Sequence, residues 1–195
     1  EIAVAEVRVL SRPTTAEVVD MNALKFGDEE TLLRYKFDNR QVTLRNPRDM
    51  AILKVQSTIA RAFGEFLSAN GFTQIFTPKI VSEGAEGGAN VFKMDYFGKQ
   101  VYLAQSPQFY KQMAMAAGFE RIFETGPVFR AEKSFTSKHA TEFTGFDLEF
   151  SYVKDHYDVM NMEAELLTYM LSEVKKQYGE EIVRLYGPEC EVVVP

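Results

Sequence analysis

Apolar and polar positions along the chain repeat with two different periods, which predict helices separated by short strands. Over residues 46–70 the apolar residues recur every three or four positions, and Asn46-Pro47 stands at the start of that run. This spacing gives a helix one apolar stripe, and Asn followed by Pro is typical of a helix start. A second helix is predicted over 106–118. A third begins at Asp155 and is expected to end before Gly179.

The segments between these helices are predicted to be strands. The longest covers 141–153, where Phe146, Leu148 and Phe150 fall on one face. The other predicted strands are 1–10, 72–76, 121–124 and 128–131, with a hairpin formed by 91–96 and 100–104. Consecutive strands that are flanked by helices favour an α+β fold built on an antiparallel β-sheet.

Composition supports a folded domain. Apolar residues make up 46% of the 195 positions, with sixteen Phe and nine Tyr, which is enough for a buried core. The net charge of -6 is unlike that of a typical nucleic-acid binder, so we expect no DNA binding and only local contact with RNA. A single cysteine, Cys190, excludes an intrachain disulfide, and no apolar run is long enough for a membrane span. These features favour a cytoplasmic protein that is not bound to a membrane.

Two neighbouring predicted strands carry side chains that together suit a nucleotide. Phe143, Gly145, Asp147 and Glu149 alternate on one face of the strand 141–153. Such a face offers a ring for stacking, close access to the backbone, and two carboxylates. On the pattern alone, a solvated face with one stray Phe explains these residues about as well.

The preceding strand adds an arginine. Arg130 stands just before the loop that joins the two strands, so it can lie beside Phe143. A planar guanidinium suits a phosphate group, although a lone arginine more often forms a surface salt bridge. A ring for a purine and a guanidinium for a phosphate together predict a nucleotide site.

These residues resemble motif 2 of the class II aminoacyl-tRNA synthetases. Phe129-Arg130-Ala131-Glu132, followed after a loop by residues 141–149, is similar to the aspartate branch of the aspartate, asparagine and lysine subgroup. Residues 71–79 resemble motif 1, and residues 105–112 are similar to the amino-acid-binding segment of aspartyl enzymes. The resemblance runs from about residue 1 to about residue 180 and implies a partial class II catalytic core.

The resemblance implies a role for each residue of an ATP site. Arg130 would hold the α-phosphate of ATP and the carboxylate of the amino acid, and would stabilise the transition state. Glu132 would accept a hydrogen bond from the adenine amino group, and Phe143 would stack on the adenine ring. His139 would lie near the β- and γ-phosphates, which Mg²⁺ would bridge. No residue of the chain is assigned as a metal ligand.

The resemblance also implies an L-aspartate site. Lys111 would pair with the side-chain carboxylate of aspartate, while Gln108 and Glu86 would hold its α-amino group. The position of Lys111 makes physical sense, because it lies one turn into a predicted helix, near the positive helix end. The alternatives are an exposed helix lysine for Lys111 and a solvated loop charge for Glu86.

Three parts of the chain follow from the resemblance. Residues 1–15 would contain the last strand of an N-terminal anticodon-binding barrel, residues 16–45 would be a linker or hinge, and residues 46–195 would form part of the catalytic domain with motifs 1 and 2. Motif 1 would build a homodimer interface that includes Phe72 and Pro78. The family's motif 3 is not found in the sequence, so we expect the chain to carry about half of the catalytic site.

Three functions are compatible with this sequence. The first is an aspartate-activating ligase that forms aspartyl-adenylate and charges tRNA(Asp). In this case Lys133 and Lys138 would meet the acceptor end of the tRNA. The second is a catalytically inactive paralogue that dimerises or regulates. The third is an adenylate-forming relative that makes asparagine from free aspartate.

Overall fold

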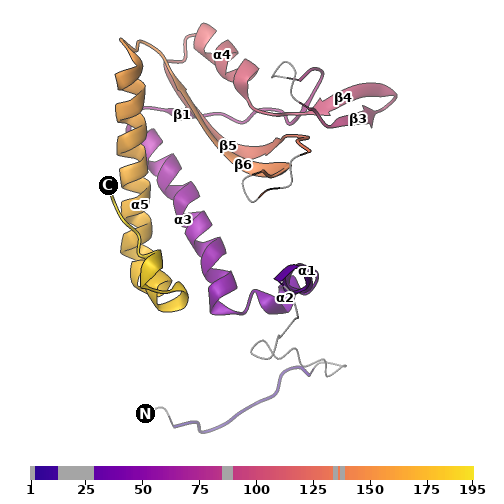
Figure 1. Cartoon of the computed structure of the whole chain (residues 1–195), viewed down its shortest axis with the longest axis vertical. Helices are drawn as coiled ribbons and strands as arrows, with labels where there is room; N and C mark the ends of the chain where they lie inside the picture. The colour runs from indigo at the N-terminus through magenta and orange to yellow at the C-terminus, as the bar shows by residue number, and fades with distance from the viewer. Residues whose placement is uncertain (1–2, 13–28, 85–89, 134–135, 137–138) are drawn as a thin grey trace. The chain divides into compact units, whose positions relative to one another are not determined.

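The computed structural model describes residues 3–12, 29–84, 90–133, 136 and 139–195 (Figure 1). The chain divides into two compact units, Glu1–Ile52 and Leu53–Pro195, and each is described by itself below. Among the described helices, none is long and apolar enough to cross a membrane.

Part of the first unit is helical where an irregular segment was expected, and the role of residues 16–45 as a linker or hinge stays a prediction. Helices α1 (Glu29–Asp38) and α2 (Arg40–Thr43) fill much of the described part of 16–45, so the prediction of an irregular segment is wrong there. Side-chain bonds hold this segment together. The Thr43 hydroxyl donates to the Lys36 carbonyl at 2.9 Å, and the Lys36 ammonium lies 2.8 Å from an Asp49 carboxylate oxygen. The sequence pattern did not reveal these bonds because they join residues 7 and 13 positions apart.

Residues 3–12 form no strand, so the strand predicted over 1–10 is wrong for the part that the structure describes. Val4, Val7 and Leu10 are all exposed. A strand needs a neighbour to pair its backbone groups, and among the described residues none pairs with this segment. Its assignment to an anticodon-binding barrel stays a prediction.

Helix α3 (Pro47–Ala69) confirms the helix predicted over 46–70. The Asn46 side chain accepts a hydrogen bond from the Arg48 backbone N–H at 2.9 Å, as expected of a residue that caps a helix. The chain leaves the helix through Gly71, whose φ of 80° few other residues adopt at low cost. From Leu53 onward the helix belongs to the second unit.

The described strands of the second unit form two small sheets. In the first, β5 (Arg121–Phe129) pairs antiparallel with β6 (Glu142–Phe150), and β1 (Thr73–Gln74) pairs with β5 in parallel. The predicted strand 72–76 is therefore shorter than expected, and this sheet is mixed. In the second sheet, β4 (Lys99–Leu103) lies between β2 (Ile80–Val81) and β3 (Lys93–Tyr96), and all pairs are antiparallel.

Strand β5 runs without a break through Gly126-Pro127, where two separate strands were predicted. Proline is tolerated where its missing N–H has no strand to bond. Strand β1 pairs with β5 only at Ile122 and Phe123, so Pro127 has no strand partner on that side among the described residues. Pro127 is paired with Thr144 on the other side.

The remaining elements begin close to where the sequence pattern predicts them. The hairpin β3–β4 turns at Phe97-Gly98, and α4 (Gln108–Ala116) occupies the helix predicted over 106–118. Helix α5 (His156–Tyr186) begins where the Asp155 carboxylate accepts from the Tyr157 N–H at 2.9 Å. It passes through Gly179 to Gly187, so its predicted end is wrong. A glycine inside a helix costs only about 1 kcal/mol, which tertiary contacts outweigh.

The core lies where α3, α5 and the first sheet meet, and Figure 1 shows the two helices side by side. The Thr58 hydroxyl donates to Gln177 at 3.3 Å, and an ion pair of 3.4 Å joins Arg61 to Glu173, which confirms their proximity. A short 3-10 helix (Pro188–Cys190) follows α5. The buried core residues are Phe63, Leu67, Phe72, Phe123 and Leu166. The second unit is thus an α+β domain, as predicted.

Candidate active site

One face of the β5–β6 pair carries the predicted site. Opposed residues of an antiparallel pair share a face, and the register places Glu124 opposite Asp147 and Gly126 opposite Gly145. The other face packs inward, where the Phe146 ring lies 5.0 Å from that of Phe63. The predicted division of the long strand into two faces, with Phe146 on the core face, is therefore confirmed.

Arg130 and Phe143 lie together on this face. The Arg130 guanidinium carbon is 5.7 Å from the centre of the Phe143 ring, within the range of a cation–π contact. The Phe143 side chain is partly open to solvent, with 39% of the residue exposed. The Arg130 backbone N–H donates to the Thr141 carbonyl at 2.9 Å, which extends the β5–β6 ladder by one bond. The two groups predicted to hold a nucleotide are thus brought side by side.

Lys111 is buried and paired. It is only 5% exposed, and its ammonium lies 2.9 Å from an Asp147 carboxylate oxygen and 3.3 Å from one of Glu149. Lys111 projects from α4 onto β6, so the alternative of an exposed helix lysine is wrong. Strand periodicity predicts both carboxylates on this face, but it does not predict their pairing with Lys111. The only sequence signal for this pairing is that Asp147 and Glu149 lie on the same face of the strand.

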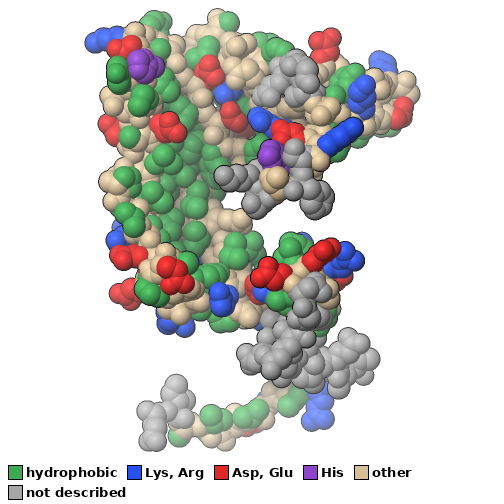
Figure 2. All heavy atoms as spheres, viewed as in Figure 1, with side chains coloured by type: hydrophobic (Ala, Val, Ile, Leu, Met, Phe, Trp, Pro, Cys, Tyr) green, Lys and Arg blue, Asp and Glu red, His purple; other side chains and the backbone are tan. Residues whose placement is uncertain are grey.

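Glu132 and His139 also come together, at the end of the β5–β6 pair. The His139 Nε2 lies 3.6 Å from a Glu132 carboxylate oxygen, and its Nδ1 lies 2.6 Å from the Thr136 hydroxyl. Both side chains are about 40% exposed, at 39% and 41%. Figure 2 shows acidic, basic and histidine side chains gathered over this end of the two strands. The structure therefore collects four predicted ATP-site residues, Arg130, Glu132, His139 and Phe143, in one region.

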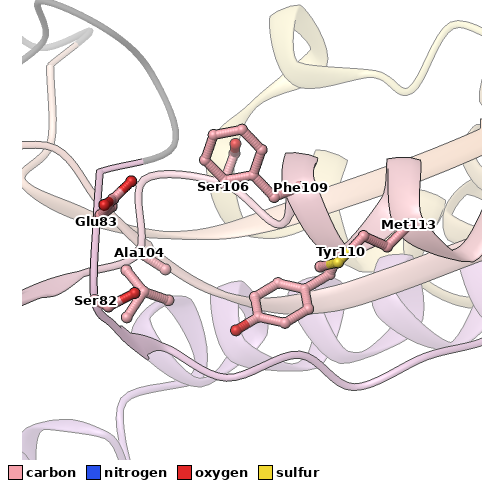
Figure 3. A pocket seen from close by; sticks show the side chains of 8 residues that line it. Ser82, Glu83, Ala104, Ser106, Phe109, Tyr110 and Met113 are labelled. Atoms are coloured by element: carbon pink, nitrogen blue, oxygen red, sulfur yellow. The ribbon is translucent and has the colours of Figure 1, made fainter.

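The predicted amino-acid site is described in part. Gln108 is half-buried at the first turn of α4, where its backbone N–H donates to the Ser106 hydroxyl at 3.4 Å. Glu86 lies outside the described residues. A cavity of about 190 Å³ adjoins the same turn of α4, with Ser82 and Glu83 on one side and Phe109 and Tyr110 on the other (Figure 3).

The two predicted interface residues have different surroundings. Phe72 is only 5% exposed, and its ring lies 5.9 Å from that of Phe150 in the core. Its side chain therefore packs within this chain, and its place in a dimer interface stays a prediction. Pro78 is exposed. The homodimer itself stays a prediction.

A metal site is not built from the described side chains. No group of three or more His, Cys, Asp or Glu side chains is placed to hold an ion in the part of the chain that the structure describes. Asp147 and Glu149 are the nearest candidates on the site face, and both contact Lys111 instead.

Comparison with known proteins agrees with this arrangement. Residues 32–192 match the family described as tRNA synthetases class II (D, K and N). The match covers most of the chain, and the chain belongs to this family of class II synthetases.

Relatives within the family point toward the aspartate enzymes. An aspartate–tRNA(Asp/Asn) ligase of Deinococcus radiodurans is 45% identical over 198 residues, which cover 100% of this chain and 44% of the relative. A cytoplasmic aspartate–tRNA ligase of Caenorhabditis elegans is 48% identical over 147 residues, covering 75% of this chain and 28% of the relative. The chain thus spans less than half the length of these curated relatives.

Solved structures give the same fold. An aspartyl-tRNA synthetase of Leishmania major, described as putative, has a TM-score of 0.72 and 35% identity, over 79% of this chain and 30% of that one. An asparaginyl-tRNA synthetase of Pyrococcus horikoshii, complexed with asparaginyl-adenylate, has a TM-score of 0.73 and 39% identity. That match covers 80% of this chain and 35% of the other. The fold is therefore that of the class II catalytic core, shared by aspartate and asparagine enzymes.

Proposed function

We propose that the protein that carries this chain activates L-aspartate with ATP and transfers it to tRNA(Asp). The observation that carries the proposal is the single sheet face on which Arg130 and Phe143 lie together beside Lys111 and its two carboxylate partners. The chain supplies part of the site, and the rest would come from segments beyond this sequence.

The proposed reaction needs orientation and charge stabilisation rather than a side-chain nucleophile. An oxygen of the aspartate α-carboxylate attacks the α-phosphorus of ATP, the bond to the bridging oxygen breaks, and pyrophosphate leaves with its electron pair. Arg130 would bind both reacting groups and the charge that develops between them. Phe143 would fix the adenine ring by stacking, and Glu132 would accept from its amino group. His139 would lie near the outer phosphates, which Mg²⁺ would bridge.

Lys111 would read the side chain of the amino acid. A lysine ammonium has three N–H donors, of which one bonds to Asp147, while Glu149 lies within ion-pair distance. A third donor would then meet a side-chain oxygen of the substrate. Gln108 and Glu86 would hold the α-amino group, as the family resemblance implies.

The charges around Lys111 make a second substrate worth testing. One ammonium facing two carboxylates leaves a net charge of -1 (+1 - 2), which favours aspartate less than a free lysine would. A neutral asparagine side chain suits such a site too, and an asparaginyl-tRNA synthetase is among the similar structures. Asparagine activation is therefore the alternative, and aspartate is preferred because the relatives that match most of the chain are named aspartate ligases.

The oligomeric state and the cellular location are proposed from the same family. We propose a homodimer in which the exposed segment around Pro78 contributes to the interface, and a cytoplasmic location like that named for the Caenorhabditis elegans relative. An inactive paralogue and an enzyme that makes asparagine from free aspartate remain as outcomes of the test.

The test is aspartate-dependent exchange of pyrophosphate into ATP, measured on the protein expressed from its complete gene and on this chain alone. We expect exchange with aspartate in the complete protein and its loss in the Arg130→Ala variant. Arg184→Ala is the matched control, because Arg184 lies exposed near the end of α5.

Each outcome decides something. If no amino acid supports exchange of pyrophosphate into ATP, the enzyme is excluded and the inactive paralogue is favoured. If asparagine supports exchange and aspartate does not, asparagine is the substrate instead of aspartate. Exchange without aminoacylation of tRNA(Asp) would favour the asparagine-forming relative. Near-normal exchange in Arg130→Ala would remove Arg130 from the site.

A further inference from the structure

A buried carboxylate on the site face has no role in the reaction proposed above. Glu124 is 3% exposed and lies on β5 directly opposite Asp147. It accepts hydrogen bonds from the Thr77 N–H at 2.8 Å, the Thr77 hydroxyl at 2.7 Å and the Lys79 ammonium at 2.9 Å. Burying a carboxylate is costly unless it is paired and hydrogen-bonded, so these three bonds fix Thr77–Lys79 firmly against β5.

Backbone hydrogen bonds connect Thr77–Lys79 to the start of residues 105–112, the segment proposed to bind the amino acid. The Lys79 carbonyl accepts from the Ala104 N–H at 2.9 Å, and the Ala104 carbonyl accepts from the Phe129 N–H at 2.9 Å. Ala104 is itself buried, at 3% exposed. It stands immediately before residues 105–108, which lead into α4, while Phe129 stands immediately before Arg130. One chain of bonds therefore joins Glu124 to both halves of the proposed site.

The Lys79 side chain packs closely against the β5 backbone at Gly126. A Cβ atom built at Gly126 would lie 3.3 Å from the Lys79 Cε and 3.5 Å from its Nζ. The Lys79 side chain thus crosses the β5 backbone where the smallest residue stands, between Glu124 and the Val128–Phe143 pair. This close approach gives Gly126 a packing role beside the ion pair.

The two halves of the site depend on Glu124 to different degrees. Arg130 is held independently, because its N–H bonds to Thr141 at the end of the long β5–β6 ladder. Residues 105–108 are not part of a strand or helix ladder until α4 begins at Gln108. On their N-terminal side they follow Ala104, which bonds to Lys79 and Phe129, and on their C-terminal side α4 is held to β6 by Lys111. Loosening Thr77–Lys79 should therefore disturb the amino-acid side more than the ATP side.

We propose that Glu124 is a positioning residue for the amino-acid site, acting through Lys79 and Ala104 on the start of α4. This inference rests on the proposed function. Glu124 touches neither substrate in this role, and Lys79 serves as its partner rather than as a ligand for phosphate.

The experiment compares steady-state constants of pyrophosphate exchange for Glu124→Gln and the wild type, in the protein expressed from its complete gene. A glutamine side chain has one acceptor oxygen and an NH₂ group that opposes the donors of Thr77 and Lys79. We expect the KM for aspartate to rise by about tenfold, the loss typical of one hydrogen bond to a charged group, while the KM for ATP changes less than about twofold. Glu191→Gln is the matched control, because Glu191 pairs with Lys175 on the exposed surface.

A second pair of variants separates positioning from simple unfolding. Lys79→Met leaves the Glu124 carboxylate buried without its cation, so the KM for aspartate should rise again. The double variant Glu124→Gln/Lys79→Met should raise it by less than the product of the two single effects, because neither partner is then left unpaired. Lys79→Arg keeps the cation and should recover part of the affinity. Thermal midpoints of all variants show whether each still folds.

Two results would overturn the inference. One is an unchanged KM for aspartate with a lowered thermal midpoint, which would make the pair structural only. The other is an equal rise in both KM values, which would mean that the disturbance is not confined to the amino-acid side. Failure of the proposed function is distinct from either, because the wild type itself would then show no amino-acid-dependent exchange.

Discussion

Replacing Lys111 with Met removes one positive charge from the most buried cation of the site. The side chain is 7% exposed, whereas those of its partners Asp147 and Glu149 are 28% and 30% exposed. Methionine keeps most of the apolar stem and volume of lysine, so the change isolates the charge. Without the ammonium, two carboxylates on neighbouring same-face positions of β6 face each other with no cation between them.

The expected cost lies between two reference values. Removing one partner of a fully buried ion pair costs about 3–5 kcal/mol, and an exposed pair is worth about 0–1 kcal/mol. Because the carboxylates retain nearly a third of their exposure, we expect about 2 kcal/mol for Lys111→Met. Asp147→Asn should cost less, about 1 kcal/mol or below, because one carboxylate then still balances one ammonium.

Urea unfolding of the chain checks this order. The midpoints should fall from wild type to Asp147→Asn to Lys111→Met, with similar slopes of free energy against urea. Lys54→Met is the matched control, because Lys54 lies exposed on α3 and should change the free energy of unfolding by less than about 0.5 kcal/mol. If the Lys111→Met protein is as stable as the wild type, or less destabilised than Asp147→Asn, Lys111 does not stabilise the fold by neutralising Asp147 and Glu149.

Two further predictions concern stability alone. Phe97 and Gly98 both have positive φ, 53° and 76°, as in a type I′ turn, and Phe97 is 90% exposed, so Phe97→Asn should stabilise by about 0.5–1 kcal/mol and raise the thermal midpoint. A lower midpoint would show that the 4.7 Å ring contact of Phe97 with Tyr96 outweighs the strain. Phe63→Ala should cost about 3–5 kcal/mol, because Phe63 is 2% exposed and packs against the rings of Phe123 and Phe146. Phe76→Ala, at a residue 79% exposed, should cost far less, and equal losses in the two variants would contradict this account.

Elements set by local sequence were predicted well. Asn46 and Asp155 accept from backbone N–H groups two residues on, so their short side chains mark the starts of α3 and α5 in the sequence itself. The turn at Phe97-Gly98 was equally local. These features need only neighbours along the chain, which a single sequence displays.

Elements set by distant partners were predicted poorly. The strand over residues 1–10 was inferred from alternation alone, and alternation cannot supply the neighbour that a strand requires. Gly179 predicts a helix end, although the helix continues past it. Strand β5 passes through Pro127 because β1 is too short to pair there, a fact that only the assembled sheet reveals.

The candidate site shows the same division between local and distant information. The face of Phe143, Asp147 and Glu149 follows from strand periodicity, but the partners of those carboxylates come from α4, 36 residues away for Asp147. Glu124 was missed altogether. In the sequence it is one of two charged residues in the predicted strand 121–124, and its partners lie 45 and 47 residues back.

The charges of the site face explain why so many side chains are already paired. Lys79, Lys111 and Arg130 bring three positive charges, and Glu124, Glu132, Asp147 and Glu149 bring four negative ones, so with His139 neutral this set sums to -1 (+3 - 4). A site without net positive charge cannot attract a polyanion such as ATP by net charge, and the whole chain carries a net charge of -6. Binding must then depend on directed contacts, in which each donor is held at a set place before the ligand arrives. Glu124, Asp147 and Glu149 fit that requirement because each holds a lysine ammonium in a fixed position.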